Sequence, residues 1–419
     1  MGLIDVLISK VIGREVVPGD IVVIDVDVVY AQDGTAPLVI DVIKKELRLE
    51  KLLAAHRAYF IIDHSAPAPH VAAATVHKEM RDFAKKYSVN LYDVGHGICH
   101  QVAIEEIVKP GMIVLGADSH TPTIGAMALF ALGVGSTDAA IAIAFGKQWV
   151  RVPPTVKLVL NGKPSEGLMS KDIILHVIGE LGTDGMIGKA VEFHGDTIRY
   201  LSMDARFTLT NMCTEMSAES AIIPLDEVAK QWLDSKGSRV YRYVDYDPSK
   251  SEFVEEIIFE VNRIEPVVAA PPDVDNVLSV GEVEKVEVDQ VFIGSCTNGR
   301  LEDIEIVAKI LTGRKVNPNT RCIISPASRK IYMEALKRGY IQALVEAGCI
   351  IAPPTCGPCV GAHMGLLAEG EVAIATTNRN FPGRMGHKNS KVYIASPATA
   401  AASAIEGKIT DPRKYLRGM

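Results

Sequence analysis

Five short apolar runs in this chain each end directly in a group of polar or reactive residues. Short apolar runs bounded by Gly and Pro, alternating with longer helical stretches such as residues 71–87, are typical of buried strands in parallel α/β sheets. Ligands of such sheets bind beyond the carboxyl ends of the strands. The sequence therefore predicts an α/β fold with parallel sheets, in which five strands bring reactive side chains to one site. The runs are residues 58–62, 112–115, 291–294, 349–351 and 372–375.

Prolines suggest where this α/β fold is divided. Pro153 and Pro154 precede a further predicted strand at residues 156–160, and residues 266–275 contain three prolines, as a linker would. A chain of 419 residues is also longer than one typical domain. We therefore expect three α/β domains, which comprise residues 1–153, 154–265 and 266–419.

Three cysteines in the expected third domain form the strongest chemical signal. Cys296 lies in Gly-Ser-Cys-Thr-Asn-Gly-Arg, and Cys356 and Cys359 form Cys-Gly-Pro-Cys. Three thiolates can hold a 4Fe–4S cluster whose fourth iron stays open as a Lewis acid. A structural zinc needs a fourth ligand, and the sequence has no second Cys-x-x-Cys. A redox pair would leave Cys296 without a role, and the spacing alone does not decide among these sites.

The remaining four cysteines are expected to be small buried residues rather than ligands. They are Cys99, Cys213, Cys322 and Cys349.

Several histidines stand beside acids or glycines in predicted loops. Asp63-His64 and Asp118-Ser119-His120 pair a carboxylate with an imidazole, and His100 lies in a similar loop. Carboxylates orient imidazoles and tune their pKa, as general acid–base catalysis requires. We expect these histidines at the site, whereas His70 and His77 are expected on the surface.

Two further pairs suggest substrate contacts. Asn211 and Glu215 are four residues apart and would share one face of a helix. Arg379 and Arg384 flank a Pro-Gly turn, and two guanidinium groups on one loop suit a substrate with more than one carboxylate.

Composition disfavours two other classes of protein. The net charge is −7 and no run of five Lys or Arg occurs, which argues against a nucleic-acid surface. The uncharged stretches 119–137 and 347–368 are interrupted by Gly and Pro, so we expect no membrane span. The scattered, odd number of cysteines and an N-terminus without an export signal predict a cytoplasmic protein.

Taken together, the motifs resemble those of the aconitase superfamily, and most of all the large subunits of 3-isopropylmalate dehydratase and homoaconitase. The resemblance covers essentially the whole chain. It rests on Gly-Ser-Cys-Thr-Asn-Gly-Arg, Cys-Gly-Pro-Cys-Val-Gly and Asn-Arg-Asn-Phe, with Gly-Ala-Asp-Ser-His-Thr-Pro, Gly-Ile-Cys-His-Gln-Val and Pro-Ala-Ser also in family order.

This resemblance implies roles for the residues in the motifs. Cys296, Cys356 and Cys359 would hold a 4Fe–4S cluster with one open iron, and Asp63-His64 would assist departure of the substrate hydroxyl as water. His100 with Asp118, and His120 with Glu215, would be supporting pairs. The residues implied in substrate or cluster binding are Gln32, Ser119, Asn211, Asn378, Arg379 and Arg384.

The resemblance also implies a partner. The family's mobile fourth domain, with its serine base, does not follow Met419, and in split members of the family it forms a separate small subunit. We therefore expect a three-domain chain that lacks the swivelling domain and is active only with a small subunit.

The implied reaction is dehydration and rehydration of a small di- or tricarboxylate. Isopropylmalate enzymes often have Thr-Cys-Thr-His-Gly after Asp-Ser-His, whereas this chain has the more aconitase-like Thr-Pro-Thr-Ile-Gly. We expect isomerisation of 2-isopropylmalate to 3-isopropylmalate in leucine biosynthesis, with homocitrate as the alternative substrate. An iron-sensing RNA-binding protein is a remote alternative that the acidic charge disfavours.

Overall fold

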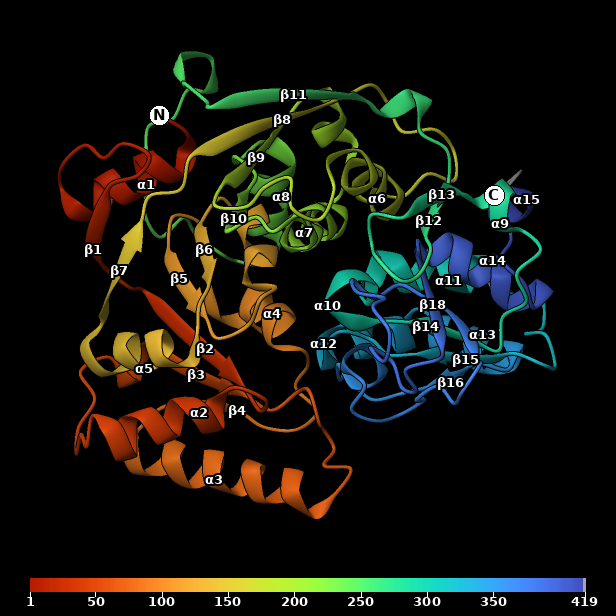
Figure 1. Ribbon diagram of the computed structural model, residues 1–419, viewed down its shortest axis with the longest axis horizontal. Helices are drawn as coiled ribbons and strands as arrows, with labels where there is room; N and C mark the ends of the chain where they lie inside the picture. Colours follow the sequence, from red (N-terminus) through yellow and green to blue (C-terminus); the bar gives the residue numbers. More distant parts are fainter. Residues whose placement is uncertain (417–419) are drawn as a thin grey trace.

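The computed structural model describes residues 1–416, so the last three residues of the expected third domain lie outside the described part. Three larger sheets follow one another along the chain (Figure 1). The red-to-orange N-terminal sheet and the cyan-to-blue C-terminal sheet lie on opposite sides of the molecule in this view, with short helices α4 (Cys99–Val102) and α10 (Ser295–Asn298) between them.

The first sheet has five strands in the order β4-β3-β2-β5-β6, all parallel. Every residue of β2 is buried, as expected for a central parallel strand covered on both faces. Side chains of three helices, among them Val39, Phe83 and Ile143, form the core on one face. The elements are β2 (Val28–Gln32), β3 (Ala58–Ile61), β4 (Asn90–Tyr92), β5 (Ile113–Gly116), β6 (Phe130–Gly133), α2 (Ala36–Asp41), α3 (Val71–Tyr87) and α5 (Ser136–Phe145).

The second sheet has four parallel strands in the order β10-β9-β8-β11. Its core is continuous with the open face of the first sheet, because Tyr30 and Val114 belong to the same buried cluster as Leu158 and Phe207. The elements are β8 (Thr155–Asn161), β9 (Ala190–His194), β10 (Ser220–Ile222), β11 (Glu255–Glu260), α6 (Ser170–Leu181), α7 (Met203–Met212) and α8 (Glu227–Ser235).

The third sheet has seven strands in the order β13-β12-β18-β17-β14-β15-β16. The five strands from β18 to β16 are parallel, and β12 and β13 add an antiparallel edge. The strands are β12 (Val267–Ala269), β13 (Val277–Ser279), β14 (Gln290–Ile293), β15 (Arg321–Ile324), β16 (Ile350–Ile351), β17 (Val372–Ala375) and β18 (Lys391–Ala395). The helices are α9 (Val280–Val283), α11 (Leu301–Leu311), α12 (Arg329–Lys337), α13 (Tyr340–Ala347), α14 (Pro397–Glu406) and α15 (Arg413–Leu416).

A two-stranded antiparallel ribbon stands apart from these sheets. It consists of β1 (Ile21–Asp25) and β7 (Lys147–Arg151), and α1 (Leu3–Ile12) packs beside it. Alternate residues of both strands are exposed, which gives the ribbon one buried and one open face.

The α/β class with parallel sheets is confirmed, and all five apolar runs form strands, namely β3, β5, β14, β16 and β17. The boundaries after residues 153 and 265 stay predictions. Two local expectations differ from the structure. His77 is buried, with Nε2 3.3 Å from Asp33, and α7 ends at Met212, so Glu215 lies on the following 3₁₀ turn rather than on the helix of Asn211.

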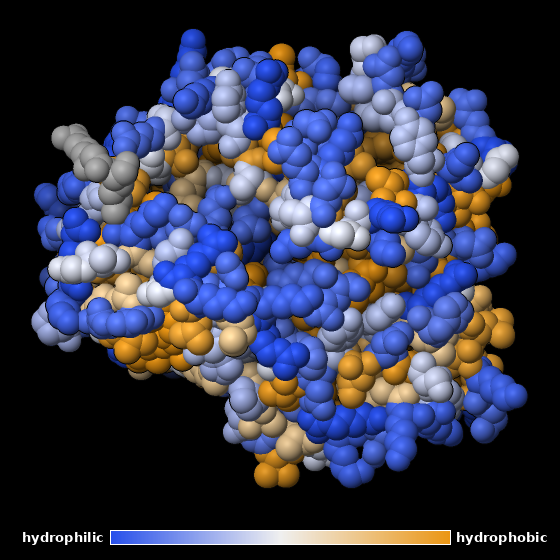
Figure 2. Space-filling view, turned by 180° about the vertical axis from the view of Figure 1, so that it is seen from behind, coloured by the Kyte–Doolittle hydropathy of each residue, from blue (hydrophilic) through white to orange (hydrophobic). Residues whose placement is uncertain are grey.

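The molecular surface mixes hydrophilic and hydrophobic residues on the face drawn in Figure 2. Within residues 1–416, every helix is too short or too polar to cross a lipid bilayer.

Candidate active site

Loops that follow the strands of the first and third sheets meet at one place. The amide of Cys356, in the loop after β16, donates to the carbonyl oxygen of Asp63, after β3, at 3.0 Å. The hydroxyl of Thr355 donates to the same oxygen at 2.7 Å. The carboxyl ends of strands from two different sheets are therefore joined, as expected from the five strand ends.

Asp63 and His64 form a rigid acid–imidazole pair at this junction. Asp63 is fully buried, and its Oδ1 accepts a hydrogen bond from His64 Nδ1 at 2.7 Å. Its Oδ2 accepts from the amide of Cys99 at 2.7 Å. The backbone of the pair is held by Asp33, whose carboxylate accepts from the amides of His64 and Ser65 at 2.7 and 2.8 Å. The imidazole thus has a fixed orientation, with Nε2 directed to the side of Asp118.

His100 and Asp118 form a second pair beside the first. His100 Nε2 donates to Asp118 Oδ1 at 2.9 Å, and His100 Nδ1 lies 2.7 Å from the hydroxyl of Tyr30. His64 Nε2 lies 3.6 Å from the other oxygen of Asp118. Although burial alone would raise it, the imidazoles of His100 and His64 hold the pKa of Asp118 well below its usual value. Asp118 is therefore a fixed negative charge between two imidazoles.

His120, Glu215 and Arg379 form a third charged group. Glu215 accepts from His120 Nε2 at 2.7 Å and from Arg379 Nε at 2.9 and 3.1 Å. Burial alone would raise the pKa of Glu215, but its bonds to His120 and Arg379 outweigh burial and lower that pKa. Burial lowers the pKa of His120 despite the neighbouring carboxylate. The pair is thus an ionised Glu215 and a neutral His120 at neutral pH.

This group predicts a pH-dependent stability. Because the folded-state pKa of Glu215 lies below its ordinary value of 4.5, its carboxylate stabilises the fold above that pH, and this contribution is lost as the pH falls through the folded-state pKa. We expect Glu215→Gln to lower the free energy of unfolding of the iron-free chain by about 2 kcal/mol at neutral pH. The difference from wild type should shrink as the pH is lowered below about 4.5.

Urea unfolding at a series of pH values measures both effects. Glu219→Gln is the control, because Glu219 is four residues away in the sequence and burial raises its pKa despite the opposing charge of Arg151. A difference between wild type and Glu215→Gln that stays constant with pH would contradict the assignment of an ionised Glu215.

The three cysteines of the expected cluster are buried, and two of them contact the amide of Asn378. Their exposed fractions are 5% for Cys296, 4% for Cys356 and 3% for Cys359. The side chain of Asn378 lies between two of them, with Nδ2 3.7 Å from Cys296 Sγ and Oδ1 3.8 Å from Cys359 Sγ. Asn211 Nδ2 donates to Cys296 Sγ at 3.2 Å. Sulfurs that accept amide hydrogen bonds are suited to carry the charge of thiolate ligands.

The backbone around these cysteines is constrained. Ser295, which precedes Cys296, has a φ of 74°, a left-handed conformation uncommon for a residue with a side chain. Gly361 has a φ of 68°, and a Cβ there would lie 2.9 Å from the carbonyl oxygen of Arg384. The Cys356–Cys359 loop is therefore packed closely against the loop that carries Arg384.

The set of donors fits an iron–sulfur cluster better than a single metal ion. Burial raises the pKa of the Cys296 thiol to about 12 and raises that of Cys356 as well, so these thiols need a metal to become thiolates. Cys356 has ligand atoms of Asp63 and His64 within 4.8 Å, whereas Cys296 and Cys359 belong to no such compact set in the described chain. Ligands spread in this way suit several irons rather than one ion.

The other predicted site residues lie around these groups. Gln32 Nε2 donates to Asp118 Oδ2 at 3.2 Å, and Ser119 is exposed beside His120, with Oγ 3.3 Å from its Nδ1. Arg384 Nε is buried and has no hydrogen-bond partner among residues 1–416. Asn211 and Asn378 contact the Cys296 loop, where each hydrogen-bonds with Thr297 Oγ1 at 2.8 and 3.2 Å. The roles of all these residues stay predictions.

Three functional neighbours were missed by the sequence reasoning. Asp33 and Tyr30, described above, orient the two histidine pairs. Arg300 is buried beside the cysteine loop, where it donates to the carbonyl oxygens of Cys296 and Thr297 at 2.6 and 2.7 Å. Asp33 and Arg300 belong to the motifs Gln-Asp-Gly-Thr and Cys-Thr-Asn-Gly-Arg, which was the available signal, whereas nothing in the sequence distinguishes Tyr30 as a partner of His100.

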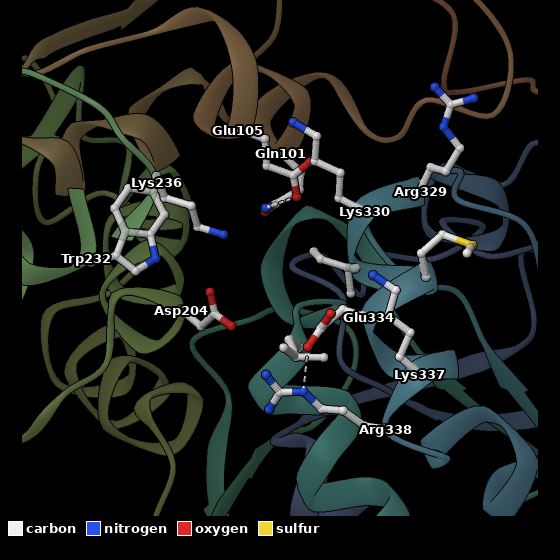
Figure 3. Close-up of a pocket in the computed structure, with 13 residues that line it drawn as sticks. Gln101, Glu105, Asp204, Trp232, Lys236, Arg329, Lys330, Glu334, Lys337 and Arg338 are labelled. Carbon is white, nitrogen blue, oxygen red and sulfur yellow. Dashed lines mark hydrogen bonds and ion pairs between the residues drawn. The ribbon is translucent and has the colours of Figure 1, made fainter. Parts of the chain in front are cut away.

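A separate cavity of about 620 Å³ lies nearby and is lined by Gln101, Glu105, Trp232 and several basic residues of α12 (Figure 3). The ammonium groups of Lys236 and Lys337 point into it. The three cysteines and the site histidines are not among the residues that line it. The predicted site residues therefore lie at the junction of the strand ends and not in this cavity.

Comparisons with known proteins identify the family of the chain. The sequence model of the aconitase family (aconitate hydratase) matches residues 7–407. The chain is 47% identical to 3-isopropylmalate dehydratase large subunit 1 of Methanopyrus kandleri, over 98% of both chains. It is 46% identical to 3-isopropylmalate dehydratase large subunit 1 of Thermotoga maritima, over 99% of both chains. It is 48% identical to 3-isopropylmalate dehydratase large subunit 2 of Archaeoglobus fulgidus, over 95% of both chains.

Proposed function

The chain belongs to the aconitase family, and from this we propose that it is the large, iron–sulfur subunit of a hydro-lyase that isomerises 2-isopropylmalate to 3-isopropylmalate in leucine biosynthesis. The observation that carries the proposal is the meeting of three buried cysteines with the Asp63–His64 pair at the strand ends. All seven cysteines are unpaired, which supports a reducing compartment, and we propose the cytoplasm.

Cys296, Cys356 and Cys359 would hold a 4Fe–4S cluster. When bound, such a cluster with three cysteine ligands supplies a Lewis acid at its open iron. The buried thiols, the amides of Asn211 and Asn378 and the guanidinium of Arg300 support this ligand set, because they fix the loop and offer hydrogen bonds to the sulfurs.

Proton transfer to the departing hydroxyl would come from His64. Its Nδ1 is engaged by Asp63, so the proton to be delivered is held at Nε2, on the side of Asp118. The negative charge of Asp118 would stabilise the imidazolium form that carries this proton. His100 would keep Asp118 in place through the bond to Oδ1.

The carboxylates of the substrate would be bound by Arg379 and Arg384. Arg379 uses only Nε for Glu215, so its two terminal nitrogens remain without a partner in the described chain. Arg384 has a buried Nε without a partner in residues 1–416. A buried guanidinium donor without an acceptor costs stability unless a ligand supplies one, which supports a carboxylate at this place.

The base that removes the C–H proton would come from a separate small subunit. The relatives named above are all called large subunits and are matched over nearly their full length. We therefore expect the chain alone to bind iron but to lack turnover.

The test combines the anaerobically reconstituted chain with the small subunit encoded in the same genome. Isopropylmalate, homocitrate and citrate are offered separately, and formation of the conjugated alkene is followed by absorbance. We expect turnover of isopropylmalate only with both subunits present. A preference for homocitrate would assign a homoaconitase, the alternative that the sequence leaves open. Robust turnover by the single chain would refute the need for a small subunit.

A further inference from the structure

Lys171 is a fully buried lysine that the proposed reaction does not use. It lies on α6, next to the second sheet, and its side chain has no solvent exposure. Its ammonium donates three hydrogen bonds, to Asn298 Oδ1 at 3.2 Å and to the carbonyl oxygens of Thr376 and Thr377 at 2.9 and 2.6 Å. A lysine is rarely buried to this extent unless its charge is compensated.

The three acceptors of Lys171 belong to the two loops that surround the cysteine sulfurs. Asn298 follows Cys296 by two residues in the loop after β14. Thr376 and Thr377 directly precede Asn378, whose amide lies between the sulfurs of Cys296 and Cys359. The ammonium group of Lys171 therefore joins two loops of the third sheet, the one after β14 and the one after β17.

Hydrogen bonds satisfy the three protons of Lys171, but no carboxylate balances its charge at contact distance. Within residues 1–416, Lys171 takes part in no ion pair. The acidic groups that act on its charge, Asp303 and Asp172, accept hydrogen bonds from other residues. Asp303 accepts from Asn298 Nδ2 at 3.0 Å and from the amide of Arg300, and Asp172 accepts from the amides of Met169 and Val267.

The pKa of Lys171 also indicates that its charge lacks a full counter-charge in the metal-free chain. Burial lowers the pKa of Lys171 to about 7, and the charge of Asp303 opposes this lowering. Cysteines bind a metal as thiolates, which carry a negative charge. Ligation would therefore bring the negative charge that the buried ammonium lacks.

We propose that Lys171 is a positioning residue that supplies the buried positive charge opposite the iron–sulfur cluster, and thereby holds the Cys296 loop against the loop of Thr376, Thr377 and Asn378 and raises the reduction potential of the cluster. This inference rests on the proposed cluster. A fixed cation close to a redox centre stabilises the more negative, reduced form, so its removal lowers the potential.

Three variants test the charge separately from packing. Lys171→Met keeps the length of the side chain without its charge, and Lys171→Gln keeps a hydrogen-bond donor without the charge. Lys163→Met is the matched control, because Lys163 is exposed in the loop that precedes α6. Each variant is reconstituted without oxygen, its iron and sulfide are measured, and its potential is determined by a redox titration followed by electron paramagnetic resonance.

We expect both Lys171 variants to show a lower potential than the control. At the wild-type midpoint, the ratio of reduced to oxidised cluster should fall about tenfold, which corresponds to ~59 mV for a one-electron couple. An unchanged potential in a Lys171 variant that keeps its cluster would overturn the proposal. If neither variant folds even without iron, Lys171 is required for the folding of the iron-free chain, and the assignment to the cluster is again overturned.

The same measurements distinguish this inference from the proposed function. Absence of iron and sulfide in the reconstituted wild-type chain would refute the proposed cluster itself. A normal cluster in wild type combined with an unchanged potential in the variants would refute only the role of Lys171.

Discussion

Cys356→Ser is expected to abolish turnover of the two-subunit enzyme and to lower its iron and sulfide content after anaerobic reconstitution. Cys356 is 4% exposed, and the bond from its backbone amide to the carbonyl of Asp63 fixes the position of its side chain beside the Asp63–His64 pair. A metal that acts as a Lewis acid supplies several kcal/mol of transition-state stabilisation. Its loss should therefore lower kcat by about 10³-fold or more.

The matched control for this variant is Cys349→Ser. Cys349 is also buried and lies just before β16, seven residues from Cys356, but it is not among the predicted ligands. It should keep its iron, its colour and most of its activity. Full activity of Cys356→Ser would refute the ligand assignment, whereas iron loss in Cys349→Ser would show that the assay reports only disturbed packing.

The strands and the ligand loops were predictable because their signals are local in sequence. Each of the five apolar runs carries its own reactive residues at its end, and the rule that ligands bind at the carboxyl ends of parallel strands predicts their meeting. The contact of Cys356 with Asp63 joins residues almost three hundred positions apart, yet both ends were visible as strand-to-loop junctions.

The supporting residues could not be predicted because their partners are distant and their own sequence context is ordinary. Lys171 opens a helix in a Ser-Lys-Asp sequence that reads as a solvated first turn, and only the packing of α6 against the third sheet buries it. His77 lies on a helix whose periodicity allows either face, and its burial depends on Asp33. Charged and polar residues are buried only where a hydrogen-bond or ion-pair partner compensates them, and a single sequence does not show that partner.

The resulting site has two kinds of rigidity. The histidine pairs are fixed within the first sheet by Asp33, Tyr30 and Asp118, through bonds of 2.7 to 2.9 Å. The Cys296 loop is fixed by Arg300, and the loop of Cys356 is held by its bonds to the carbonyl oxygen of Asp63. Reactive groups need this kind of support to keep their geometry during proton transfer. The substitution of one reactive group should therefore leave the other groups in place.

His64→Gln tests this separation, and we expect it to lower kcat by about 10²- to 10⁴-fold while the iron and sulfide content stays at the wild-type level. The glutamine amide can still donate to Asp63, but it cannot deliver a proton from the side that faces Asp118. Asn211, Asn378 and Arg300 support the Cys296 loop, and the amide of Cys356 bonds to the backbone carbonyl of Asp63, which the substitution leaves unchanged, so the cluster should persist.

His96→Gln is the control for His64→Gln, because His96 is a half-buried histidine whose ring bonds only to the carbonyl of Asp93. It should retain wild-type kcat. The KM for isopropylmalate should change little in His64→Gln, since Arg379 and Arg384 would still bind the carboxylates. A His64→Gln enzyme with an intact cluster and near wild-type kcat would transfer the role of proton donor to another group, and His100 would be the next residue to substitute, because it shares Asp118 with His64.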